Sequence, residues 1–190
     1  MADRQAAYDA LLRASFPAFL HRCFLAVSPG DVFEDNWHLE AIGWRLKRIQ
    51  SGEINRLIVT VPPRSLKSIA ISVAWVAWRL GHDPKLRFVC VSYSADLALK
   101  HARDCRAIMS MPFYRRAFPH TVLSRQRSAE HDFTTTARGG RFSTSVGGTM
   151  TGRGGRRHHH RRPDQARGRR IRCGPQYGQW LVRLHPLLAS

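Results

Sequence analysis

Lys67 and Ser68 are the neighbouring side chains in this 190-residue chain whose types best fit a defined chemistry. They stand at the start of a predicted helix, after the turn 61–66, and a short apolar run precedes that turn. Backbone N–H groups at a helix start favour anionic oxygens. A lysine there can neutralise phosphate charge, and a serine hydroxyl can ligate Mg²⁺. The sequence therefore predicts a phosphate-binding loop at residues 61–68.

The turn departs from the usual phosphate-binding pattern at its two glycine positions. Glycine is usual there because the chain turns sharply and approaches the phosphates closely. In this chain Val61 and Leu66 occupy those positions. On local chemistry alone, a helix start with a solvated lysine explains the pair Lys67-Ser68 equally well, so both interpretations stay open at this point.

The elements that must position this turn follow from the spacing of apolar residues. Apolar positions every three or four residues predict helices, whereas short β-branched runs bounded by turns predict strands. Helices are predicted at 5–26 (interrupted at Pro17), 37–50, 66–80 and 95–109, and strands at 57–61 and 87–93. The strand 57–61 is expected to be parallel and buried, and helix 66–80 is apolar nearly all round. This order predicts an α/β fold with a doubly wound sheet, followed by a hairpin that turns at residues 138–140.

Length, charge and hydropathy limit the classes of protein that fit. The chain has 31 Lys and Arg against 13 Asp and Glu, a net charge of +18, which favours a polyanionic partner. No uncharged run exceeds eleven residues, which is too short to cross a bilayer. Charged residues interrupt every apolar stretch near the N-terminus, so no secretory signal is expected. The four cysteines lack Cys-x-x-Cys spacing and are expected to be reduced thiols in a cytoplasmic protein.

The positive charge is concentrated at the C-terminal end. Residues 155–190 hold nine Arg and one acid, a net of +8, whereas residues 1–154 carry the remaining +10. A boundary is therefore predicted near Gly154, between a folded body, 1–154, and a basic tail, 155–190, that we expect to be mostly disordered. An Arg-rich tail that binds nucleic acid is one interpretation. A metal site at His158–His160 is disfavoured, because adjacent side chains on one segment rarely converge.

Three blocks of the body, in order, resemble the ATPase domain of the large terminase subunit of tailed bacteriophages. The blocks are Ile54–Ser68, Val89–Asp96 and Gly139–Gly154. The resemblance covers roughly residues 30–154, and its loop begins with Pro-Pro-Arg and tolerates replacement of the glycines. It implies a truncated P-loop NTPase-type fold with a doubly wound sheet.

The resemblance also implies a nucleotide site that binds ATP and Mg²⁺. It implies that Arg64 contacts the γ-phosphate, that Lys67 holds the phosphates, and that Ser68 ligates the metal. The implied cofactor-binding residues are Pro63, Arg64, Ser65, Leu66, Lys67 and Ser68. The alternative for Arg64 is an ordinary surface residue after a Pro-Pro turn. Trp37 and His38 lie where the family places its adenine-side segment, but plain helix packing is the expectation for both.

The function that the resemblance implies is ATP-driven packaging of double-stranded DNA into a procapsid, in the cytoplasm of a bacterial host. The implied partners are DNA, the small terminase subunit and the portal protein, with no membrane. The alternative, from another class, is a non-catalytic basic protein that binds nucleic acid. ATP hydrolysis distinguishes the two functions.

The family's enzymes carry a strand ending in two acids after the third block, and a nuclease domain beyond it. This chain instead continues with Arg and His at 156–162, so we expect it to be catalytically incomplete. Codons allowed for residues 158–163, read after dropping one base, spell Ile-Ile-Ile-Asp-Asp-Pro. We therefore infer a one-base slip near Gly152–Gly155, which would make the basic tail an accident of reading frame. DNA reads across residues 152–157 test this hypothesis.

Overall fold

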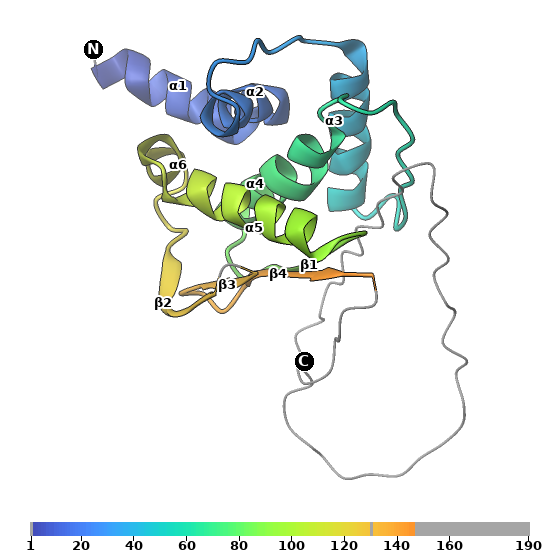
Figure 1. Ribbon diagram of the computed structural model, residues 1–190. Helices are drawn as coiled ribbons and strands as arrows, with labels where there is room; N and C mark the ends of the chain where they lie inside the picture. The colour runs from blue at the N-terminus through green and yellow to red at the C-terminus, as the bar shows by residue number, and fades with distance from the viewer. Residues whose placement is uncertain (1, 130, 147–190) are drawn as a thin grey trace.

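The computed structural model describes residues 2–129 and 131–146, which form a mixed α/β fold around a four-stranded mixed sheet. In Figure 1 the helices lie on one side of this sheet, with α5 lying over the strands and running along them, and α3 at the far end of the helical layer. The α/β prediction is therefore confirmed at this level.

Most of the described chain up to Ala117 is helical, and three of the four strands follow one another after it. The helices are α1 (Ala2–Ala14), α2 (Phe16–Val27), α3 (Trp37–Gln50), the π-helical η1 (Ile69–Trp75), α4 (Val76–His82), α5 (Ala95–Ser110) and α6 (Pro112–Ala117). The strands are β1 (Arg87–Ser92), β2 (Leu123–Ala129), β3 (Asp132–Thr135) and β4 (Gly140–Ser145).

The predicted N-terminal helix is broken into α1 and α2, and the helix axis bends by 106° between them. Ser15 caps α2, since its hydroxyl accepts a hydrogen bond of 3.4 Å from the Ala18 amide. Pro17 then lies in the first turn of α2, where its missing N–H costs nothing. The predicted break is confirmed, but it lies at Ser15, two residues before Pro17. No single described helix is long and apolar enough to cross a membrane, and the bent α1–α2 pair meets that test by length and composition alone.

The sheet has the order β1-β4-β3-β2. β1 and β4 are parallel, with Arg87 opposite Gly140 and Ser92 opposite Ser145. β3 is antiparallel to both of its neighbours, β4 and β2. Because β4 pairs with β1 on one side and β3 on the other, β1 forms one edge of the sheet.

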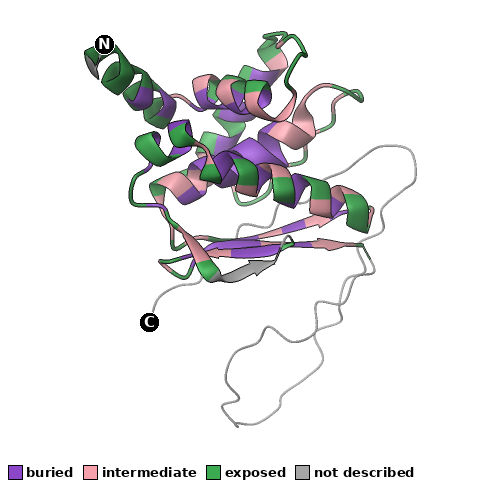
Figure 2. Cartoon of the chain, turned by 60° about the vertical axis from the view of Figure 1, so that its left-hand side comes forward, coloured by how far each residue is buried: buried purple, intermediate pink, exposed green. Residues whose placement is uncertain are grey.

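The core lies among the helices and between them and the sheet, as the buried residues in Figure 2 show. Helical backbone runs without interruption from Lys67 to His82, through η1 and α4. Every residue from Ala70 to Trp78 is buried, as the apolar sequence of this helix predicts. Trp75 is fully buried, and its ring stacks on Trp78 at 5.4 Å and meets Phe16 edge-on at 5.2 Å.

The strand predicted at residues 57–61 is wrong, because these residues form no strand in the structure. Leu57 and Val59 pack against the core, but Ile58 is 73% exposed. An extended run joins a sheet only where a neighbouring strand satisfies its backbone N–H and C=O groups. The strand that follows it in the chain, β1, pairs with β4 instead. The β-branched composition was a correct sign of burial on one side but not of strand pairing.

The hairpin predicted around residues 138–140 is confirmed by the antiparallel pairing of β3 with β4. Arg138 has a φ of 68°, so the turn uses the left-handed region. At Gly139 a Cβ would lie 2.2 Å from the Pro84 carbonyl oxygen and 2.5 Å from that of Leu86. Only glycine lets the turn approach the segment before β1 this closely.

Candidate functional site

The loop that precedes the Lys67 helix turns through two residues with left-handed backbone. Arg64 has a φ of 64° and Leu66 a φ of 53°. Such backbone angles are uncommon for residues other than Gly, Asn and Asp. Leu66 occupies the position that glycine takes in the usual phosphate-binding loop, so the chain makes the same kind of turn there without a glycine. The Leu66 side chain packs against the core, which anchors the turn.

Lys67 and Ser68 form the first helical turn, as the sequence predicts. The Ala70 amide donates to the Leu66 carbonyl oxygen at 2.8 Å, so helical hydrogen bonding begins at the loop itself. Ser68 has helical backbone and its side chain makes no capping hydrogen bond. Its hydroxyl is therefore not used to close the helix start.

The six predicted nucleotide-binding residues lie together in one continuous loop and first turn. Pro63 and Arg64 are exposed, whereas Ser65, Leu66, Lys67 and Ser68 are half-buried. Exposed amides at a helix start favour anions. The segment from Arg64 to Ser68 thus brings an arginine, a lysine, a serine hydroxyl and the amides of a helix start into five consecutive residues.

A contact that the sequence did not predict joins this loop to α3. The Nε2 atom of His38 lies 3.2 Å from the Ser65 carbonyl oxygen. Because a carbonyl oxygen only accepts, Nε2 must carry the proton of this hydrogen bond. Residues 27 positions apart are joined in this way, so the start of α3 positions the centre of the loop.

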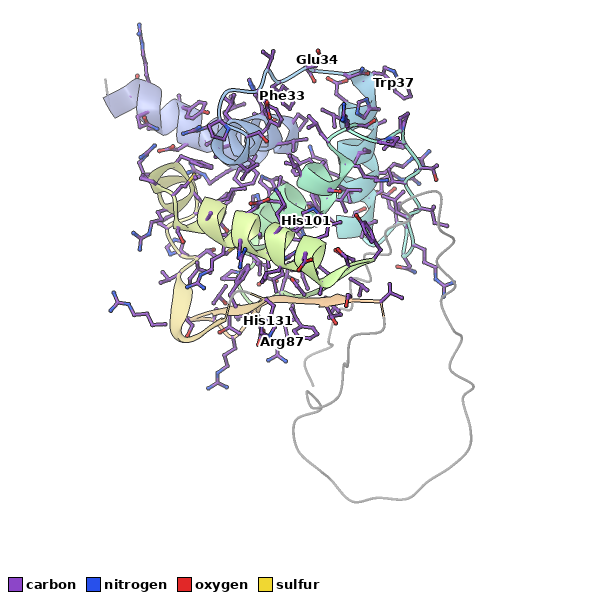
Figure 3. All side chains as sticks on the ribbon, in the orientation of Figure 1. Phe33, Glu34, Trp37, Arg87, His101 and His131 are labelled. Carbon is purple, nitrogen blue, oxygen red and sulfur yellow. The ribbon has the colours of Figure 1, made fainter. Side chains whose placement is uncertain are left out.

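Plain helix packing is wrong for Trp37, which begins α3 and is 78% exposed. Figure 3 shows its ring at the outer end of α3, pointing away from the helical layer. His38 is half-buried and carries the loop contact, so it does contribute to packing. The apolar spacing that predicted α3 correctly places Leu39, Ile42 and Leu46 inside, which leaves Trp37 outside.

A second polar cluster, also not predicted, lies under α5 on β4. Arg141 is 1% exposed; its Nε atom donates to Cys90 Sγ at 3.3 Å and its Nη1 atom to Ser143 Oγ at 2.7 Å. Its Nη2 atom has no hydrogen-bond partner among the described residues. Burial, and next the charge of Arg141, lower the pKa of His101 on α5 to about 4. The alternating pattern of β4 was the signal for this cluster, because Arg141 and Ser143 face the same side of the strand.

The described residues include three of the four cysteines. There Cys23, Cys90 and Cys105 are free and buried, which confirms reduced thiols for these three. Burial raises the pKa of Cys105 to about 12, so it stays a thiol. Between residues 2 and 146, position 130 apart, no three His, Cys, Asp or Glu gather into a metal site. The predicted tail 155–190, with its expected disorder and its histidines, lies outside the described residues.

Comparisons with known proteins do not assign the chain to a family. No family model matches it, no curated protein matches it, and no solved structure matches it.

Proposed function

We propose that residues 1–154 are the N-terminal part of a P-loop ATPase domain of the terminase type, which binds ATP and Mg²⁺ to package double-stranded DNA. The observation that carries the proposal is the left-handed backbone of Leu66 directly before a helix that begins with Lys67-Ser68. A solvated lysine at an ordinary helix start requires no such turn. A loop that wraps an anion at a helix start does, because its amides must point inward.

Each predicted residue has a part in this proposal. Lys67 neutralises the β- and γ-phosphates, Ser68 ligates Mg²⁺ through its hydroxyl, and Arg64 contacts the γ-phosphate. The bound Mg²⁺ would supply charge neutralisation during phosphoryl transfer. Pro63, Ser65 and Leu66 shape the loop, which His38 fixes from α3. The small terminase subunit, the portal protein and DNA are the proposed partners, in the cytoplasm of a bacterial host.

The open edge at β1 supports a larger, doubly wound sheet. Leu57–Val61 has the composition of a buried parallel strand, but among the described residues it has no strand partner and β1 pairs on one side only. A parallel strand between the two would satisfy both. The inferred one-base slip supplies such a segment, ending in two acids, in the alternative reading frame. DNA reads across residues 152–157 that show an unbroken frame, and no relation of the shifted frame to the terminase family, would remove this part of the proposal.

The nucleotide site is tested by ATP binding rather than by turnover. We expect the purified chain to bind a fluorescent ATP analogue with Mg²⁺, and Lys67→Ala to abolish that binding. Lys85→Ala is the matched control, since Lys85 is an exposed lysine in the loop before β1. Equal binding by wild type and Lys67→Ala would refute the site.

ATP hydrolysis is expected to stay at background, because the acids that position Mg²⁺ and activate water are absent from the reading frame of this chain. A turnover that Lys67→Ala abolishes would show that the chain is catalytically complete.

The second candidate function is a non-catalytic basic protein that binds nucleic acid, and the net charge of +18 favours it. The basic residues on α5 and α6 support it less than their number suggests. Lys100 pairs with Asp104 at 2.7 Å and Arg116 with Asp9 at 3.3 Å, so part of their charge is neutralised within the fold. Absence of ATP binding together with nucleic-acid binding would favour this function.

A further inference from the structure

The outward face of α3 exposes two tryptophans. Trp37 is 78% exposed and Trp44 is 54% exposed. They are seven residues apart, two helical turns, and so lie on the same side of the helix, about 10 Å from each other. The opposite side buries Leu39, Ile42 and Leu46 against the core. Trp side chains are highly buried on average in folded proteins, so two exposed rings on one helix face need a cause.

Trp44 is flanked by two guanidinium groups. The Cζ atom of Arg45 lies 4.8 Å from the Trp44 ring centroid, and that of Arg48 lies 4.9 Å from it. Arg48 also binds Glu53 at 2.8 Å, which neutralises its charge. Arg45 and Lys47 are exposed, and no ion pair links either to the rest of the described chain. We call Trp37, Trp44, Arg45 and Lys47 the α3 face.

Ordinary helix stability explains only part of this set. Lys47 lies in the last turn, where a positive charge is favourable beside the carbonyl end of the helix. That effect falls off beyond the last turn and gives no role to an exposed indole ring. An aromatic surface beside unpaired positive charge matches a ligand that has both flat rings and negative charges.

We propose that the α3 face binds single-stranded nucleic acid: the Arg45 guanidinium leaves the Trp44 ring to hold a phosphate beside Lys47, and a base stacks on Trp44 in its place. Bases of a duplex are already stacked on one another, so an exposed indole can stack only on an unpaired base. Trp37 offers a second stacking surface further along the helix. The inference goes beyond ATP-driven packaging of duplex DNA and does not depend on nucleotide binding at Lys67.

The test measures binding of the full-length chain to labelled oligothymidylate, to oligouridylate and to a DNA duplex of the same length. Trp44→Ala should weaken binding to both single strands by roughly 5- to 150-fold, the range for loss of one base stack. Trp44→Phe, which keeps a ring, should retain most of the affinity. The basic tail is present in every variant, so its contribution cancels in the comparison.

Tyr8→Ala on α1 is the matched control, because Tyr8 is an exposed aromatic residue on another helix. It should leave affinity unchanged, as should Lys85→Ala, which removes an exposed lysine outside the α3 face. Unchanged single-strand affinity in Trp44→Ala, with unchanged circular dichroism, would overturn the proposal. An equal loss of duplex binding would also overturn it, since that loss would not reflect stacking. Dissolution of a self-associated form by Trp44→Ala, with no loss of nucleic-acid affinity, would assign the face to a second copy of the chain instead.

Discussion

The position of Lys67-Ser68 at a helix start could be predicted from the sequence, but the backbone conformation of the loop before it could not. Lys67-Ser68 at a helix start follows from the apolar spacing of the helix and from the Pro-Pro turn before it. The left-handed backbone of Arg64 and Leu66 does not, because propensity disfavours it for both side chains. Such angles persist only where surrounding packing imposes them, as the buried side of Leu66 does here.

Arg64→Gly should separate stability from ligand binding. Arg64 is exposed and left-handed, so glycine relieves roughly 1–2 kcal/mol of backbone strain, less about 0.5–1 kcal/mol for its greater freedom when unfolded. We expect the free energy of unfolding in urea to rise by up to about 1 kcal/mol. The proposed contact of Arg64 with the γ-phosphate predicts that affinity for ATP falls in the same variant. Arg56→Gly, in a segment without positive φ, should instead destabilise. The same change in stability for both variants would contradict the backbone argument.

His101 and Arg141 set a pH dependence for the fold. Desolvation first, then the charges of Arg141 and Lys100, lower the pKa of His101 to about 4, while Asp104 opposes them. The unfolded state therefore binds more protons than the folded state between pH of about 6.5 and about 4. Stability is fully present above this window and is lost as the pH falls through it, by up to about 3 kcal/mol.

Urea unfolding at several pH values measures this loss. His101→Gln should flatten the curve between pH 7 and the acid limb. Arg141→Met should raise the pKa of His101 and so reduce the loss. It should also leave the fold as stable or more stable at neutral pH, because it removes a buried charge whose Nη2 atom finds no hydrogen bond in the described part of the chain. A curve that His101→Gln leaves unchanged would mean that another group governs the acid transition.

At the scale of elements, periodicity predicted the helices well because each has a clear buried stripe. α3 and α5 begin at or next to their predicted positions, and η1 with α4 forms the predicted buried helix. The segment 57–61 failed because its strand character depended on a neighbour that its own residues do not specify. The π-helical turns of η1 could not be predicted either, because no local pattern distinguishes them from α-helix.

The turn between β3 and β4 lies too close to the segment before β1 to accept a side chain at Gly139. At Gly139 a new Cβ would meet backbone atoms of Pro84, Lys85 and Leu86 at 2.2–2.6 Å, and these cannot rotate away. Gly139→Ala should therefore push β4 from the segment before β1 and destabilise by about 1–3 kcal/mol or more. Gly43→Ala is the milder comparison, because its Cβ would lie 3.2 Å from the Phe16 ring, a side chain. Thermal unfolding measures both, and equal losses would show that the tight approach at Gly139 is not what limits the turn.

For the molecule as a whole, the edge of the sheet predicts self-association, and the net charge of the chain predicts binding to nucleic acid. Within residues 2–129 and 131–146, β1 is an open edge of the sheet, and exposed sheet edges pair readily with other strands. We therefore expect the isolated chain to self-associate, in a way that does not require nucleic acid. Sedimentation of nuclease-treated protein tests this, and a monodisperse monomer with a cooperative melt would contradict it.

The net charge makes a separate prediction about nucleic-acid binding, because its two parts act by different physics. The nine Arg of residues 155–190 face almost no counter-charge in sequence, so their binding to duplex DNA should release counterions and weaken steeply with salt. Replacing all nine with Gln keeps the length of the chain and should lower the slope of log K against log salt by up to about 8. Trp44→Ala should instead lower single-strand affinity with little change in slope, because stacking releases few ions. Salt titrations of both variants distinguish the two: an unchanged slope after the Arg replacements would move the electrostatic contact from the tail to the folded body.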